Sequence, residues 1–227
     1  MTGKRARKLG RPPASSSAET RQRILDVARV SFAEQGYGVT TNKYVATKAG
    51  ITTGALYHYF DSKLDIYVAV NDHVQRHIYA RFRAALDANT TFLARFEAIL
   101  EAARQLNIED PSLARFVGAA RIDIARHDEL RERMAVLPGE GTAVLSELVS
   151  TGVATGEIRP ADRRRVTAFI RTVFIGLVDA VSDDTDEHAA AIEAIRALLH
   201  GRLLQAPVTP ISAGARRRPG SRRSTSS

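Results

Sequence analysis

Residues 32–63, FAEQGYGVTTNKYVATKAGITTGALYHYFDSK, contain two short segments with helical character that are separated by a glycine. The first helix is predicted over Asn42–Lys48 and ends at Gly50. The second is predicted over 53–59, with the Thr52 hydroxyl as its N-cap. Two short helices joined by a tight turn form a helix-turn-helix, and the second helix of that motif can enter the major groove of DNA.

The residues at the tip of the second predicted helix suit a nucleic-acid backbone. The first N–H groups of a helix are unpaired and attract phosphate, and the Thr52 hydroxyl can donate to the same group. Thr53 can reach a base edge or a thymine methyl, and Gly54 lets the backbone come close to the DNA. Tyr57 and His58, one turn later, provide donors for phosphates. We therefore expect this helix tip to contact DNA.

The opposite face of the same helix is apolar and is expected to be buried. Leu56 and Phe60 are separated by four residues and so share this face, whereas Tyr59 fits either side. Lys63, at the start of the next helix, adds a positive charge and a helix N-terminus near the same DNA backbone. The aromatic cluster at 57–60 is thus explained by two faces of one helix.

Helical patterns cover the remainder of the chain, and strand signals such as sustained alternation or an Asn-Gly turn are nearly absent. We expect an all-α fold with nine or ten helices. Beyond the two short helices, the predicted helices cover residues 16–36, 62–88, 91–106, 110–126, 128–155, 160–182 and 186–205. The Pro138-Gly139 step is expected to kink or split the segment that contains it.

The composition limits the class of protein. The 227 residues include no cysteine, which excludes disulfides and thiolate metal sites. No apolar run approaches the roughly 18–20 residues of a membrane span, and the basic N-terminus has no apolar segment of a signal peptide. We therefore expect a cytoplasmic protein that does not associate with a membrane.

The positive charge is concentrated at the two ends of the chain. The net charge is +8, but residues 1–14 and 207–227 carry +5 each, which leaves −2 on residues 15–206. The end segments have the composition of a basic arm and of a disordered basic tail, and both suggest a polyanionic partner, although solubilising ends would look the same. In the sequence KRARKLGRPP, Arg11 is the candidate for insertion into a narrow minor groove.

Neither metal nor enzyme chemistry is indicated. His73 and His77 have a spacing that can hold zinc, but no third ligand is evident, and a solvated helix surface explains them better. The sequence contains no nucleophile motif, no glycine-rich phosphate loop and no adjacent carboxylate pair. We expect no metal, no cofactor and no catalytic residues.

Three motifs within residues 20–70 resemble the DNA-binding domain of the TetR family of bacterial repressors. They are F-A-E-Q-G-Y-x-x-T-T (32–41), A-x-x-A-G-I (46–51) and G-A-L-Y-H-Y-F-x-S-K (54–63). The resemblance implies an all-helical homodimer that binds double-stranded operator DNA and is released by a small-molecule effector. It implies a DNA-binding domain over 15–62 and an effector-binding and dimerisation domain over 63–206.

Carried over by position, the resemblance assigns DNA contacts to nine residues. These are Thr40, Thr41, Lys43, Thr52, Thr53, Gly54, Tyr57, His58 and Lys63. Two positions depart from the family pattern: the family often has a basic residue where Thr53 stands and usually has an acid where Tyr44 stands. A charged contact with guanine is therefore not expected from Thr53, and Tyr44 has either a packing role or a role at the DNA.

The segment 160–182 is apolar on nearly all sides, which suggests that it is buried on two faces. Together with the amphipathic segment 186–205 it is expected to form a helix pair that meets its copy in a symmetric dimer. The predicted interface residues are Phe169, Ile170, Val173, Leu177, Ile195 and Leu199. The alternative is that both helices complete a monomeric core.

The resemblance places an effector pocket among the helices that follow the DNA-binding domain. The candidate wall residues are Phe96, Phe116, Ala120, Ile124 and Phe174, each of which could equally be plain core. Charged residues inside the apolar stretches, namely Arg121, Asp123 and Asp179, either face the pocket or pair elsewhere. This balance predicts a mostly hydrophobic effector.

Two functions fit the sequence. The first is a ligand-responsive repressor, although the sequence does not distinguish repression from activation. The second is a non-specific or architectural nucleic-acid-binding protein that relies on its basic ends. Sequence-specific binding that survives deletion of residues 1–14 and 207–227 would distinguish the first from the second.

Overall fold

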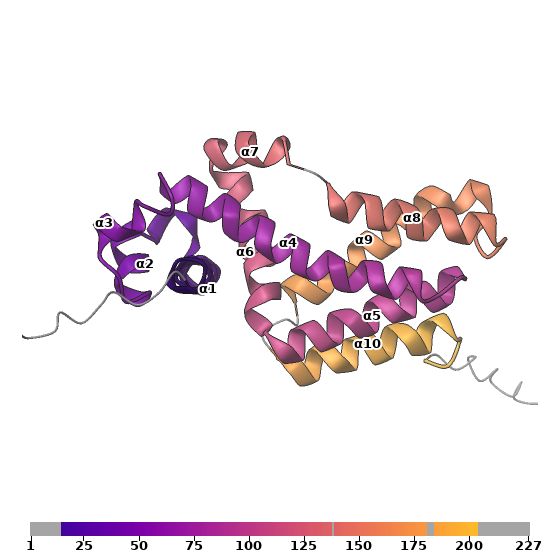
Figure 1. Cartoon of the computed structure of the whole chain (residues 1–227). Helices are drawn as coiled ribbons and strands as arrows, with labels where there is room; N and C mark the ends of the chain where they lie inside the picture. Colours follow the sequence, from indigo (N-terminus) through magenta and orange to yellow (C-terminus); the bar gives the residue numbers. More distant parts are fainter. Residues whose placement is uncertain (1–14, 138, 181–183, 204–227) are drawn as a thin grey trace, which may run out of the picture.

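The computed structural model describes residues 15–137, 139–180 and 184–203, and these residues form ten α-helices, one short 3-10 turn and no strand (Figure 1). The predicted all-α fold is confirmed. The helices are α1 Ser15–Val39, α2 Asn42–Lys48, α3 Thr53–Leu56, α4 Lys63–Asp87, α5 Phe92–Glu109, α6 Pro111–Arg126, α7 Asp128–Ala135, α8 Glu140–Ala154, α9 Arg163–Asp179 and α10 Thr185–Leu199, and the 3-10 turn is Pro160–Asp162.

Several helix ends follow from local sequence, and one differs from expectation. The segment predicted over 128–155 is two helices, α7 and α8, separated where the sequence has the Pro138-Gly139 step, as expected. The helix predicted over 53–59 is shorter, because α3 ends at Leu56 and the chain continues in turns. Within the described part of the chain, none of the helices is both long enough and apolar enough to span a membrane.

α1 is interrupted at Gly36, which has φ of +77° and would be strained with any side chain. A Cβ at this position would also lie 3.3 Å from the Asp123 carboxylate. The chain then turns toward α2, and the Thr40 hydroxyl donates to the carbonyl of Gly36 at 2.9 Å. Gly36 therefore ends the regular part of α1 near the residue where the sequence predicted it.

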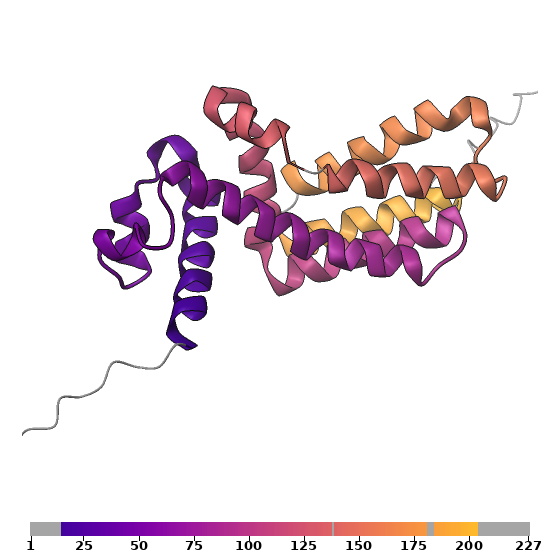
Figure 2. The ribbon, with the colours of Figure 1, turned by 45° about the horizontal axis from the view of Figure 1, so that its top comes forward.

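α4 connects the helix-turn-helix to the larger helical part of the molecule (Figures 1 and 2). An apolar stripe at helical spacing runs along it: Ile66, Val70, Val74 and Phe82 are buried and Ile78 is half-buried. Its N-terminal half packs against α1, and its C-terminal half packs against α5 and α8. One continuous helix thus contributes to both cores.

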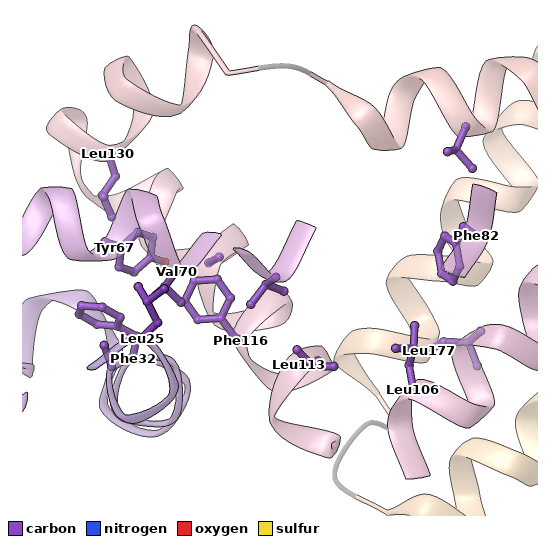
Figure 3. Packing of buried hydrophobic residues seen from close by; sticks show 14 of the residues in the cluster. Leu25, Phe32, Tyr67, Val70, Phe82, Leu106, Leu113, Phe116, Leu130 and Leu177 are labelled. Atoms are coloured by element: carbon purple, nitrogen blue, oxygen red, sulfur yellow. The ribbon is translucent and has the colours of Figure 1, made fainter. Parts of the chain in front are cut away.

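An aromatic cluster joins α1, α4 and α6. The Tyr67 ring lies 4.7 Å from that of Phe32 and 5.5 Å from that of Phe116, measured between centroids, and all three rings are buried (Figure 3). At the edge of the cluster, the Asp123 carboxylate of α6 accepts the backbone N–H of Tyr37 at 2.9 Å and the hydroxyl of Tyr67 at 3.1 Å. Burial and the Asp123 charge raise the pKa of Tyr67, so that this hydroxyl stays protonated and remains a donor.

Tyr37 also contacts Lys63 and His127. The Lys63 ammonium lies 4.1 Å from the centroid of the Tyr37 ring and donates to the Tyr37 carbonyl at 2.7 Å. The His127 ring meets the Tyr37 ring edge-on at 5.2 Å. Burial, with a smaller contribution from Glu129, raises the pKa of Tyr37. The end of α1 is therefore fixed against both α4 and α6.

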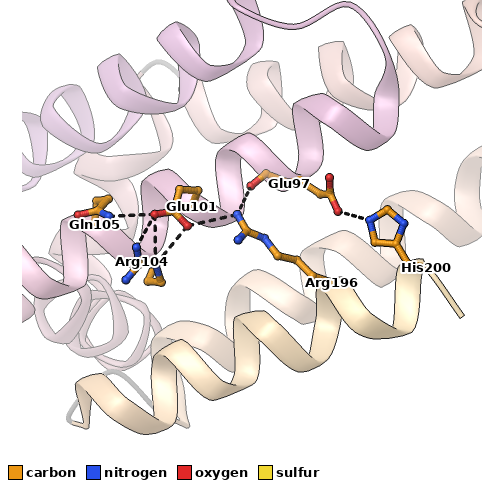
Figure 4. Close-up of polar contacts among 6 residues, drawn as sticks. All are labelled: Glu97, Glu101, Arg104, Gln105, Arg196 and His200. Atoms are coloured by element: carbon orange, nitrogen blue, oxygen red, sulfur yellow. Dashed lines mark hydrogen bonds and ion pairs between the residues drawn. The ribbon is translucent and has the colours of Figure 1, made fainter. Parts of the chain in front are cut away.

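The last helix is attached to α5 by a polar cluster (Figure 4). Arg196 donates to the Glu97 carbonyl at 3.1 Å and to the Glu101 carboxylate at 3.2 Å. The His200 ring lies 2.6 Å from the Glu97 carboxylate. α10 therefore runs antiparallel to α5, whereas α9 packs mainly against α8 and α6. The two helices predicted to act as a pair have different neighbours.

We predict that Asp123→Ala destabilises the fold by about 2–4 kcal/mol, because two buried donors lose their acceptor. Urea unfolding of the two proteins measures the difference in the free energy of unfolding. Glu132→Ala on the exposed side of α7 is the control and should change this free energy by less than about 0.5 kcal/mol. Equal stability of Asp123→Ala and the parent chain would contradict the importance given to this carboxylate.

We predict that Glu101 contributes to the loss of stability of the fold in acid. Hydrogen bonds from Arg104, helped by Gln105 and Arg196, lower the pKa of Glu101 from 4.5 to about 2. The folded pKa lies below the unfolded one, so Glu101 stabilises the fold above pH 4.5 and loses this contribution as the pH falls toward 2. Glu101→Gln should therefore flatten the pH dependence of the free energy of unfolding between pH 4.5 and 2. An unchanged slope would show that the cluster does not act through Glu101.

Candidate DNA-binding surface and ligand cavity

The turn between α2 and α3 fixes the direction of α3. Gly50 has φ of +70°, a conformation that favours glycine, and the next N–H, that of Ile51, donates to the Ala46 carbonyl at 3.0 Å. Val45 and Ala46 on α2 and Leu56 on α3 are buried beneath the turn. Phe60 is buried too, so both residues predicted to anchor the second helix do so.

The N-cap hydroxyls of both helices are at the surface. The Thr41 oxygen accepts the N–H of Tyr44 at 3.2 Å, and the Thr52 oxygen accepts the N–H of Ala55 at 3.1 Å. Each hydroxyl uses its oxygen as the cap and keeps its hydrogen for another partner. Since both threonines are exposed, each can stabilise its helix and still donate a hydrogen bond outward.

Tyr57 is the most prominent group at the end of α3, with 51% of its surface exposed. Its hydroxyl oxygen accepts a hydrogen bond from the Asn42 amide at 3.3 Å, and so its own hydrogen remains available. Asn42 is the first residue of α2 and was not among the predicted contact residues. Its position directly after the Thr41 cap was a signal that sequence reasoning could have used. The structure thus brings the start of α2 and the end of α3 together.

Most of the other residues predicted to contact DNA are at the surface. Lys43, Gly54 and His58 are exposed, and Thr53 is half-buried at the first position of α3. Tyr44 is also half-buried, with the Lys48 ammonium 5.6 Å above its ring, which favours the packing role for Tyr44. The surface therefore presents donors from two helix starts and from the end of α3.

Three of the residues predicted to contact DNA are not simply exposed at this surface. Thr40 is 1% exposed and its hydroxyl donates to backbone carbonyls of Ser31 and Gly36, so its assignment as a DNA contact is wrong for the side chain. The Lys63 ammonium is half-buried against Tyr37, which makes it first a part of the junction between α1 and α4. Arg11 lies outside the described residues.

A cavity of about 430 Å³ lies among α4, α5, α6, α8, α9 and α10. Its wall is mainly apolar, with side chains that include Ile78, Phe82, Leu106, Val117, Leu145 and Phe174. The volume falls in the range of small-molecule sites, about 300–1,000 Å³. A cavity of suitable size therefore lies among the helices where the effector pocket was predicted.

Of the five predicted wall residues, only Phe174 lines this cavity, and the other four assignments are wrong for it. On α6, Phe116 and Ala120 are buried, and the Phe116 ring packs against Tyr67 on α4. Ile124 is partly buried against the same core. Phe96 is buried among other phenylalanine rings, 5.9 Å from that of Phe92. The sequence correctly indicated that these residues are apolar and at least partly buried, but they pack in the core and do not line the cavity.

The polar wall residues of the cavity include Gln75, Tyr79, Thr142 and Arg171, together with two pairs that differ in their partners. Arg121 and Asp179, two charged candidates from the sequence, both line the cavity and form an ion pair with each other. Asn107 and His188 are each only 3% exposed. Among the described residues, the amide nitrogen and oxygen of Asn107 have no hydrogen-bond partner, and the Nδ1 of His188 has none either. Burial lowers the pKa of His188, which favours its neutral form.

The residues predicted for a dimer interface have different positions. Ile170 and Leu177 are buried within the protomer, so their assignment to an interface is wrong. Val173, Ile195 and Leu199 are half-buried and pack against the core of the same chain. Phe169 is 41% exposed, and Ile175 and Leu198, which were not predicted, are exposed as well.

Residues 24–70 match the family model described as bacterial regulatory proteins, tetR family. The chain is 30% identical over 166 residues to the transcriptional repressor KstR2 of Mycolicibacterium smegmatis, a match that covers 69% of this chain and 77% of that protein. It is 36% identical over 94 residues to the transcriptional regulator SrpR of Pseudomonas putida, covering 41% of this chain and 44% of SrpR.

Solved structures share the fold. The regulator FadR of Bacillus subtilis, solved in complex with stearoyl-CoA, has a TM-score of 0.62 at 22% identity, and the match covers 77% of this chain and 96% of that one. The ketosteroid regulator KstR2 of Mycobacterium tuberculosis has a TM-score of 0.57 at 21% identity, covering 76% and 92% of the two chains.

Proposed function

This chain belongs to the TetR family of bacterial regulatory proteins, and on that premise we propose that it is a repressor that binds a palindromic operator as a homodimer and releases it when a small, mostly hydrophobic effector binds. The observation that carries the proposal is the helix-turn-helix surface. Thr41, Thr52 and Tyr57 each have a free donor at the surface, and the two helices are anchored beneath it, α2 by Val45 and Ala46 and α3 by Leu56.

The proposed DNA contacts are of two kinds, those to phosphates and those to bases. Tyr57, Asn42 and Thr41 lie where α2 and α3 meet and would grip phosphates, which fix the protein on DNA without reading its sequence. Thr53 and Gly54 at the start of α3 would approach base edges in the major groove. Because Thr53 is uncharged, its contribution to base reading would come from one hydroxyl and one methyl group.

A second copy of the chain is needed to present two such surfaces. One face of α9 supports this, since it exposes Phe169 beside the exposed small residues Ala168, Thr172 and Gly176, whereas the exposed Ile175 is a wall residue of the cavity. An exposed apolar helix face of this kind favours a symmetric contact with its copy. In such a dimer the two recognition helices would be about 34–36 Å apart, one turn of DNA.

The effector would act through helices shared by the cavity and the DNA-binding part. Ile78 and Phe82 of α4 and Val117 of α6 line the cavity, and the same two helices carry Tyr67 and Asp123, which hold the end of α1. A ligand that fits only one arrangement of α4 and α6 would bias the orientation of the helix-turn-helix. FadR was solved with stearoyl-CoA, whose acyl chain is long and apolar, and this supports an effector with a large apolar part.

The proposal predicts selective DNA binding that weakens steeply with salt. With about 6–10 phosphate contacts, affinity should fall about 10³–10⁵-fold between 50 and 200 mM salt. Tyr57→Phe should weaken every site by about 5- to 150-fold, because each of the two subunits loses one hydrogen bond to phosphate of about 0.5–1.5 kcal/mol. Thr53→Ala should instead change the preference among sites.

Gel shifts with genomic fragments and random DNA measure these effects, and Glu132→Ala on α7 is the control that should bind like the parent chain. Absence of any preference over random DNA would overturn the repressor proposal. Loss of nearly all binding on deletion of residues 1–14 and 207–227 would favour a non-specific nucleic-acid-binding protein instead.

The proposed dimer is expected to depend on Phe169. Phe169→Asp should convert the dimer to a monomer at micromolar concentration, because it places a charge in a buried apolar contact. Sedimentation velocity measures the change. Val136→Asp is the matched control, since Val136 is 73% exposed at the end of α7 and lies on a different helix. A Phe169→Asp dimer as stable as the parent would exclude this face of α9 as the interface.

A further inference from the structure

We propose that the cavity binds an uncharged lipophilic alcohol, whose hydroxyl group pairs with Asn107 and His188. The inference rests on the proposed function, because it names the chemical class of the effector. It is carried by two buried polar side chains from different helices that line the same mainly apolar cavity: among the described residues, both polar atoms of Asn107 and the Nδ1 of His188 lack a hydrogen-bond partner.

Asn107 provides the first part of the argument. It lies on α5 between Leu106 and the helix end, it is 97% buried, and both its amide nitrogen and its carbonyl oxygen are unpaired. Each unpaired buried polar atom costs about 1–3 kcal/mol, so a leucine would be more favourable if packing were the only role. A side chain with one free donor and one free acceptor at a cavity wall is suited to a group that both accepts and donates.

His188 provides the second part. The contacts of Glu97 with His200 and of Glu101 with Arg196 set α10 antiparallel to α5 (Figure 4), and this register carries His188 to the same end of the helix pair as Asn107. His188 is equally buried, and its Nδ1 is unpaired. A neutral imidazole nitrogen accepts or donates one hydrogen bond according to its tautomer. The two side chains therefore lie at the same end of the helix pair and both line the cavity.

Charge in the cavity argues against an ionised ligand. Arg121 and Asp179 neutralise each other in their ion pair. Arg171, the other arginine of the wall, is exposed and can keep its charge in water. A carboxylate beside Asn107 would face the amide carbonyl, which repels it, and would lose its hydration. A ketone would satisfy the amide N–H₂ but leave the amide oxygen unpaired, whereas a hydroxyl pairs with both.

The experiment uses the full-length chain and three probes with ten carbons each: 1-decanol, 2-decanone and decanoate. Isothermal titration calorimetry measures the dissociation constants. We expect 1-decanol to bind about 3- to 10-fold more tightly than 2-decanone, the value of one additional hydrogen bond, and decanoate to bind most weakly.

Variants connect this preference to the two side chains. Asn107→Leu and His188→Phe should each reduce the ratio of the two dissociation constants toward one. Val117→Ala is the matched control in the apolar wall, and it should weaken the alcohol and the ketone equally. Asn107→Leu should melt at the same or a higher temperature than the parent chain, because it removes two unpaired buried polar atoms. A lost preference is then a property of the site, since the variant remains folded.

Equal binding of alcohol and ketone, strongest binding of decanoate, or no binding of any probe would overturn the inference. Gel shifts on the same preparations separate it from the proposed function. Operator binding without an alcohol preference overturns the ligand class and leaves the repressor proposal intact. An alcohol preference that Asn107→Leu removes, in a chain that binds no operator, supports the ligand site and overturns the repressor.

Discussion

The buried carboxylate of Asp123 connects the end of α1, next to the helix-turn-helix, with α4 and α6, two helices that line the cavity. It accepts hydrogen bonds from the Tyr37 backbone at the end of α1 and from the Tyr67 hydroxyl on α4, while it is itself part of α6. A buried carboxylate requires such partners, because leaving it or its donors unpaired would cost several kcal/mol. The direction of α1, and with it the direction of the helix-turn-helix, is therefore tied to the positions of α4 and α6.

That link gives the cavity a physical route to the proposed DNA-binding surface. α4 and α6 line the cavity with Phe82 and Val117 at one end and hold Tyr37 at the other. Close-packed aromatic rings around Tyr67 do not compress, so a shift of either helix has to be met by a shift of α1. Occupancy of the cavity and the spacing of two helix-turn-helix units in a dimer would then be coupled in free energy.

Local features were readable from the sequence because they depend on neighbouring residues. Thr41 and Thr52 cap their helices as expected, Gly50 makes the turn, and the stripe along α4 is buried as its spacing indicates. Most of the predicted DNA-contact positions lie at the surface for the same reason. Thr40 is the exception, since the sequence does not show that its hydroxyl turns inward to the carbonyl of Gly36.

Residue spacing and turn residues were enough to predict an all-helical chain with a helix-turn-helix near its start. Which apolar faces meet depends on the packing of the whole chain: Phe116 faces the junction with α4 while Val117, the next residue, lines the cavity. That packing also brought Asn107 of α5 to the same end of a helix pair as His188 of α10. Helical periodicity reveals that a face is apolar, but the partner of that face is set by how all the helices pack together.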